Sequence, residues 1–243
     1  MKIDKEACTG CELCRPYCPV GAIQAVEHKS EIVSDIDQDA CVECGVCLKA
    51  DVCPADAIYE TELEWPRSIR AAFSNPMVRH PSSGASGRGT MEMKTNDVTG
   101  RYRRGFAGIS IEMGRPGIGT TFRDLQTVSM SLGRLGVIFE SDNPVTATMI
   151  DAKTGKFSEE VLNERVLSAI IEFKIETNRL QEVLETLREV SGKIETVFSV
   201  GIISRIGPEG SMPNVEIARK AGFSPRPNTK TNVGLGRPLI EEV

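Results

Sequence analysis

Residues 8–19 read CTGCELCRPYCP, and residues 41–54 read CVECGVCLKADVCP. Each stretch holds three cysteines separated by two residues and ends on a fourth cysteine followed by proline. The spacing differs only in the last gap, which is three residues in the first run and five in the second. All 8 cysteines of the 243-residue chain lie in these two runs. The residues after Cys53 therefore carry no thiol that could ligate a metal.

The cysteine spacing favours metal ligation over disulfide bonds. Two-residue gaps suit chelation by neighbouring thiolates, and the first residues, MKIDKE, lack the apolar segment of an export signal. A structural zinc ribbon is the main alternative, because CxxC pairs also bind zinc. Three cysteines and a fourth before proline, written twice, fit zinc poorly and are typical of iron–sulfur ligation. The sequence therefore predicts two iron–sulfur clusters in a protein of the reducing cytoplasm.

The cysteine runs belong to an internal repeat of about 33 residues. Residues 3–8, IDKEAC, recur as IDQDAC at 36–41, and residues 18–23, CPVGAI, recur as CPADAI at 53–58. Each half predicts a short strand, a cysteine loop and a helical turn after the proline. In this pattern residues 1–60 resemble the bacterial-type dicluster ferredoxins, which carry two 4Fe–4S clusters in a small pseudo-twofold fold. The resemblance covers about a quarter of the chain.

The resemblance implies that the fourth cysteine of each run ligates the cluster of the other run. One cluster would be held by Cys8, Cys11, Cys14 and Cys53. The second would be held by Cys41, Cys44, Cys47 and Cys18. The longer gap before Cys53 adds an acid, Asp51, and changes the loop beside one cluster. We therefore expect two unequal reduction potentials, with the sign of the difference left open.

Charge divides the chain into three zones. Residues 1–60 hold 5 basic and 12 acidic side chains, a net of −7, residues 61–134 are net +5, and residues 135–243 are net −3. The acidic zone at residues 1–60 favours binding to basic docking sites on partner proteins. The total of −5 predicts neither a nucleic-acid partner nor binding to an anionic membrane. No apolar run approaches the roughly 20 residues of a membrane-spanning helix.

The segments on either side of the C-terminal domain are irregular in sequence. Residues 61–104 form a connector rich in arginine, glycine, proline and serine, which is either a flexible linker or a segment that docks a partner. Residues 204–243 predict an extended Pro/Gly-rich tail that wraps a neighbouring surface or a partner, with disorder at its end as the alternative. No family resemblance is assigned to residues 61–243.

Residues 105–203 predict a strand, a helix, a glycine and a strand, twice over. The first copy is a strand at 109–113, a helix at 121–135 and a strand at 137–140. The second is a strand at 170–175, a helix at 178–191 and a strand at 194–203. Capping boxes are expected at Thr121 with Asp124 and at Asn178 with Gln181, and a short helix is expected from Ser158 through Val166. Two such βαβ repeats predict an α+β domain, a ferredoxin-like split βαβ sandwich without cysteines.

A glycine-rich loop directly before the first of these helices is a candidate anion site. Three glycines expose backbone amides, and a helix N-terminus adds positive potential that could hold a phosphate or a carboxylate. The alternative is a plain turn that joins strand to helix. The candidate residues are Gly114, Arg115, Gly117, Gly119, Thr120 and Thr121.

The sequence favours electron transfer over catalysis, since it contains no credible catalytic triad or carboxylate pair. The leading hypothesis is the iron–sulfur subunit of a larger anaerobic oxidoreductase, hetero-oligomeric with its redox donor and acceptor proteins. One alternative is a ferredoxin-dependent reductase with an anionic substrate at Gly114–Thr121. The other is a ligand-sensing domain that gates electron flow.

Overall fold

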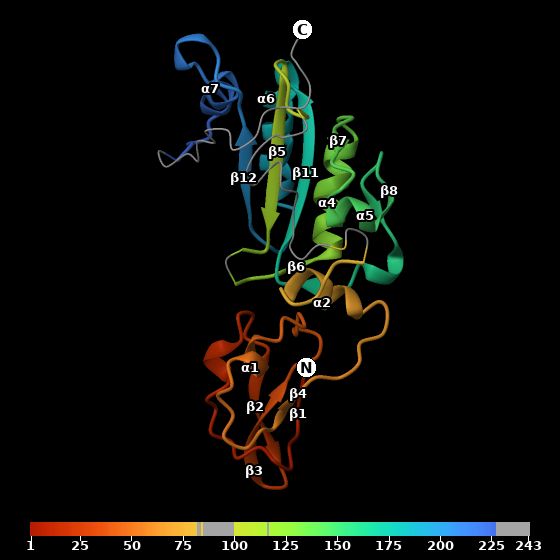
Figure 1. The fold of residues 1–243 in the computed structure, drawn as a ribbon, viewed down its shortest axis with the longest axis vertical. Coiled ribbons are helices and arrows are strands. Elements are labelled where there is room, and N and C mark those ends of the chain that lie inside the picture. Colours follow the sequence, from red (N-terminus) through yellow and green to blue (C-terminus); the bar gives the residue numbers. More distant parts are fainter. Residues whose placement is uncertain (82–83, 85–99, 116, 227–243) are drawn as a thin grey trace.

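The computed structural model describes residues 1–81, 84, 100–115 and 117–226. Figure 1 shows a small N-terminal module at one end of the molecule and a larger helix-and-sheet domain at the other, with helix α2 (Ser68–Ser74) between them. Among the described residues, none of the helices is both long enough and apolar enough to cross a membrane.

The N-terminal module is built from two antiparallel strand pairs. Strand β1 (Lys2–Ile3) pairs with β4 (Ile58–Tyr59), and β2 (Ile23–His28) pairs with β3 (Glu31–Ile36). A 3-10 turn (Arg15–Tyr17) and helix α1 (Val46–Lys49) occupy equivalent places just before the fourth cysteine of each run.

The chain makes a single hydrogen-bonded turn after each proline, in which the Gly21 amide donates to the Cys18 carbonyl at 3.3 Å and the Asp56 amide to the Cys53 carbonyl at 3.2 Å. It then enters β2 and β4 and does not continue as a helix. The next amides, those of Ala22 and Ala57, donate to the Cys18 and Cys53 sulfurs, at 3.1 and 3.3 Å.

The C-terminal domain is a four-stranded antiparallel sheet with two long helices. Its strands are β5 (Phe106–Met113), β7 (Ile138–Phe139), β11 (Ala169–Glu176) and β12 (Phe198–Ile203), in the order β12-β5-β11-β7. Helix α4 (Phe122–Gly133) follows β5, and helix α6 (Leu180–Ser191) follows β11. The central strands pair along their whole length, from Ala169 opposite Met113 to Glu176 opposite Phe106.

A subsidiary segment between β7 and β11 packs beside α4. It contains helix α5 (Pro144–Thr148), the pair β8 (Met149–Asp151) and β9 (Lys156–Phe157), a 3-10 turn (Glu159–Val161) and β10 (Arg165–Val166). Strand β10 pairs with β6 (Thr120–Thr121) at the start of α4.

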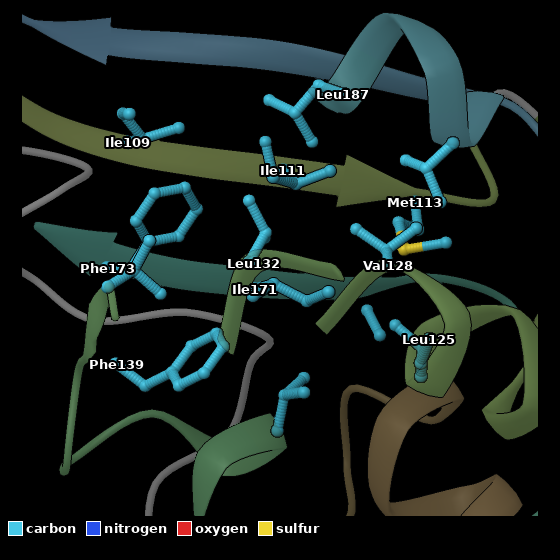
Figure 2. Close-up of a cluster of buried hydrophobic side chains, with 14 of the residues drawn as sticks. Ile109, Ile111, Met113, Leu125, Val128, Leu132, Phe139, Ile171, Phe173 and Leu187 are labelled. Atoms are coloured by element: carbon cyan, nitrogen blue, oxygen red, sulfur yellow. The ribbon is translucent and has the colours of Figure 1, made fainter. Parts of the chain in front are cut away.

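One face of the sheet forms the core. Alternate residues of β5, Ile109, Ile111 and Met113, are completely buried, as period-2 alternation predicts for a strand with one covered face. Figure 2 shows them facing the apolar stripe of α4 (Leu125, Val128 and Leu132) and Leu187 of α6, with Ile171, Phe173 and Phe139 from the neighbouring strands. Each such side chain contributes about 1.5–3 kcal/mol through burial.

The helix ends test the predicted caps. The capping box at Thr121 is confirmed. The Thr121 hydroxyl accepts a hydrogen bond from the Asp124 amide at 3.1 Å, and the Thr121 amide donates to the Asp124 carboxylate. The box at Asn178 is wrong: a 3-10 turn (Thr177–Arg179) precedes α6, whose first turn has no side-chain cap. The short helix from Ser158 is also wrong beyond Val161, because the following residues pair with β6.

The sequence patterns did not predict a helix in either flanking segment. In the connector, α2 turns Ile69, Ala72 and Phe73 into the core of the C-terminal domain. In the tail, helix α7 (Pro213–Lys220) packs against α6 and β12. Each helix is only about two turns long and lies in a segment rich in proline, glycine or charge, so neither shows the long apolar periodicity that predicts a helix. Residues 82–83, 85–99 and 227–243 of these segments lie outside the described residues.

A matched pair of glycines tests the packing beside α4. Gly155 and Gly136 both have left-handed backbones, with φ +75° and +69°. A Cβ on Gly155 would lie 2.5 Å from the Ser129 carbonyl oxygen, whereas nothing lies within 4 Å of one on Gly136. Both alanine variants should lose about 1–2 kcal/mol through backbone strain, and Gly155→Ala should lose more through the clash. Equal unfolding free energies for the two variants in denaturant titrations would contradict this packing.

Candidate functional site

The structure gathers the eight cysteines around two cavities in the N-terminal module. One cavity is lined by Cys8, Cys11, Cys14 and Cys53. The other is lined by Cys18, Cys41, Cys44 and Cys47. They enclose about 310 and 300 Å³ of space, open mouths included. Each cavity thus combines three cysteines of one run with the fourth cysteine of the other. We call them the first and the second cavity.

Two equivalent backbone links produce this exchange. The Asp4 amide donates to the Ala57 carbonyl at 2.8 Å, and the Asp37 amide donates to the Ala22 carbonyl at 2.8 Å. The chain then turns, with the Cys8 amide bonded to the Asp4 carbonyl and the Cys41 amide to the Asp37 carbonyl. Each run therefore begins beside the residues that follow the fourth cysteine of the other run.

Backbone amides point at several of the sulfurs, including those of Cys41, Cys44 and Cys47. Besides the bonds to Cys18 and Cys53, the Ser34 amide lies 3.4 Å from the Cys8 sulfur. Such donors favour the thiolate, which is the form that binds metal. Four sulfurs around one cavity, with amides directed at them, are the donor set that a 4Fe–4S cluster requires.

Burial opposes ionisation of these thiols in the absence of metal. It raises the pKa of Cys14, Cys41 and Cys44, and it raises the pKa of Cys47 to about 11, with further contributions from the neighbouring thiols. Near neutral pH these thiols are therefore protonated, and a bound metal must displace their protons. Affinity for iron should fall as the pH is lowered.

The two cavities differ in their surroundings. In the second cavity Cys41, Cys44 and Cys47 are all buried. In the first only Cys14 is buried and Cys11 is exposed. Leu13, which lines the first cavity, has an exposed fraction of 52%. The first cavity therefore opens toward solvent beside this apolar side chain.

Two arginines of the connector bind the loop around Cys41. Arg67 donates to the Glu43 carboxylate at 2.6 Å, and that carboxylate also pairs with the N-terminal ammonium. Arg70 donates to the Cys41 carbonyl at 2.7 Å and forms an ion pair with Glu164 of the C-terminal domain. The arginine-rich sequence predicts docking by the connector as a whole and does not single out this pair. Their spacing of three residues on one helix face is the signal that could have identified them.

The structure places the predicted anion loop against the N-terminal module. The Gly114 amide donates to the Val197 carbonyl, and the Gly119 amide donates to the Gly114 carbonyl. The Thr121 amide donates to the Asp124 carboxylate. The Arg115 side chain pairs with Glu112 at 3.3 Å, and Thr120 is buried in β6. A Cβ added to Gly117 would lie 3.1 Å from the Pro19 carbonyl oxygen, and one added to Gly119 would lie 3.7 Å from the Val20 side chain, so the loop packs closely on these two residues. An anion site there stays a prediction.

Comparison with known proteins finds matches for the N-terminal quarter. The family described as 4Fe-4S binding domain matches residues 1–24. Ferredoxin-3 of Chlorobaculum tepidum is 41% identical over 66 residues, 25% of this chain and 95% of that protein. The pyruvate synthase subunit PorD of Methanocaldococcus jannaschii is 39% identical over 62 residues, 26% of this chain and 66% of that protein.

A longer relative is a subunit of the ion-translocating oxidoreductase complex of Methanosarcina acetivorans. It is 41% identical over 51 residues, which span 21% of this chain and only 17% of that protein. The chain thus covers about a sixth of this relative and just under two thirds of the PorD protein. No solved structure matches the chain significantly.

Serine variants test the exchange of the fourth cysteines. Serine is a harder and weaker ligand for iron–sulfur clusters than cysteine, so each variant should alter one cluster signal in the reduced protein. We expect Cys53→Ser to change the same electron paramagnetic resonance signal as Cys14→Ser. Cys18→Ser should change the same signal as Cys47→Ser. If Cys53→Ser instead changed the same signal as Cys47→Ser, the arrangement of the cavities would be contradicted.

Proposed function

Through its first 60 residues this chain belongs to the ferredoxin family of 4Fe–4S proteins, and on that premise we propose that it transfers single electrons through two clusters. The observation that carries the proposal is the pair of four-cysteine cavities. We assign Cys8, Cys11, Cys14 and Cys53 as ligands at the first cavity. We assign Cys18, Cys41, Cys44 and Cys47 as ligands at the second cavity. A 4Fe–4S cluster accepts and releases one electron at a potential set by charge, hydrogen bonds to sulfur and exposure.

The residues around the first cavity favour exchange with a protein partner. Cys11 reaches the surface, and the exposed side chain of Leu13, which also lines the cavity, offers apolar contact there. The module that carries them has a net charge of −7, which steers a basic partner toward this face. The buried thiols of the second cavity are shielded from such direct contact.

The larger role that fits is an iron–sulfur subunit of an oxidoreductase complex. Two relatives are named as subunits, one of pyruvate synthase and one of an ion-translocating complex. We infer a hetero-oligomer in which the C-terminal domain binds a redox partner protein. Recovery of the native protein as a lone chain after gentle anaerobic purification would contradict this part of the proposal.

The C-terminal domain fits a scaffold for such binding. Its β5-α4-β7-β11-α6-β12 succession and its strand order support a split βαβ sandwich, the fold expected from the sequence. That architecture serves many functions, so the proposal rests on the cysteine cavities and not on this fold.

The charge of the module provides a test with two electron acceptors. Oxidation of the reduced protein by the basic protein cytochrome c should slow as ionic strength rises. At 0.1 M salt, the attraction between opposite charges that lie more than about 10 Å apart is largely screened. Oxidation by ferricyanide, an anion, should speed up over the same range. Stopped-flow absorbance measures both rates. Salt dependences of the same sign for the two acceptors would contradict steering by the acidic module.

A further inference from the structure

The C-terminal domain contacts two of the chain segments that carry cysteines of the second cavity. The glycine loop before α4 packs on Pro19 and Val20, directly after Cys18. Arg70 of α2 binds the carbonyl of Cys41. Both cysteines line the second cavity, whereas the first cavity has an exposed cysteine at its edge. The domain therefore adjoins the second cavity at two places.

Arg70 connects the two parts of the molecule. Arg70 is only 5% exposed, and arginine is rarely so buried unless its charge is paired. One terminal nitrogen donates to the carbonyls of Cys41, Gln38 and Asp39, at 2.7, 2.9 and 3.2 Å. Its Nε forms an ion pair with Glu164, and both side chains of that pair are largely buried, at 7% and 12% exposure.

The order of these charges matters for the second cavity. The guanidinium touches the cysteine loop on one side and the carboxylate on the other, so the positive charge lies nearer to the cysteines. Arginine stays charged at any ordinary pH. In a buried setting such a charge is poorly screened, and it favours a neighbouring group in its more negative, reduced state. Glu164 partly offsets this effect from the far side.

We propose that the Arg70–Glu164 ion pair lets the C-terminal domain set the reduction potential of the cluster bound at the second cavity. Arg70 is a positioning and charge-bearing residue in this proposal and ligates nothing itself. The inference rests on the proposed function, since it requires a cluster at each cavity. It identifies an interdomain contact, in addition to the longer Cys47–Cys53 gap, as a source of unequal potentials.

The other charges at this loop stay in place during the test. Glu43 is 2% exposed and is paired with Arg67 and the N-terminal ammonium. These groups contact the same loop but not Glu164. Changes confined to Arg70 and Glu164 therefore report on the interdomain pair.

Four variants of the full chain, purified anaerobically, test the proposal in redox titrations followed by electron paramagnetic resonance. Arg70→Gln should lower the midpoint potential of the signal that Cys18→Ser alters. Glu164→Gln should raise it, because the offsetting charge is lost. Arg70→Lys should shift it less than Arg70→Gln does. Arg123→Gln, an exposed arginine of α4 bonded to Asn163, is the control and should shift neither signal.

The opposite signs separate electrostatics from mere disturbance of the fold. Shifts of the same direction in Arg70→Gln and Glu164→Gln, equal shifts of both cluster signals, or no shift in either variant would overturn the inference. If Arg70→Gln fails to fold, the sign of the Glu164→Gln shift decides. A wild-type chain with a single cluster signal would instead overturn the proposed function, so the two failures are distinguishable.

Discussion

The exchange of the fourth cysteines between the two runs constrains the whole N-terminal module. Neither run can complete a four-thiol cavity alone, so the two halves must fold together. The bonds from Asp4 to Ala57 and from Asp37 to Ala22 hold the halves in place, and the short strand pairs follow from them. Burial raises the pKa of Cys47 to about 11, so a bound metal must displace protons that the buried thiols hold near neutral pH. A pseudo-twofold backbone is the simplest arrangement that meets these requirements.

The symmetry of the module ends at its surface. The first cavity opens to solvent at Cys11, whereas the second lies against the C-terminal domain. Arg70 and the glycine loop before α4 both contribute to that contact. A domain without cysteines can thus act on redox chemistry by position and charge, through a guanidinium buried between a cysteine loop and a carboxylate. The two sites become unequal because their neighbours differ, even though their cysteines are arranged alike.

Local patterns in the sequence predicted local structure well. The alternation of Ile109, Ile111 and Met113 identified the central strand, and Thr121 with Asp124 identified the start of α4. The cysteine runs indicated iron–sulfur ligation, and the family resemblance implied which cysteines meet. Features that depend on distant partners were missed. The amide of Ala22 bonds to sulfur and ends the expected helical turn, and the role of Arg70 depends on a partner 94 residues away. Spacing along the chain can place such residues on one face of a helix, but it does not show which distant group they contact.

The central claim is that one module of about 60 residues holds two four-thiolate sites, each completed by the other run. Native mass spectrometry of the anaerobically purified full chain tests it most directly, because it reads bound mass without assuming activity. The account predicts a chain that carries the added mass of two 4Fe–4S clusters, and the loss or conversion of one of them in Cys53→Ser. A wild-type chain that carries one cluster, or zinc in place of iron and sulfide, would contradict it.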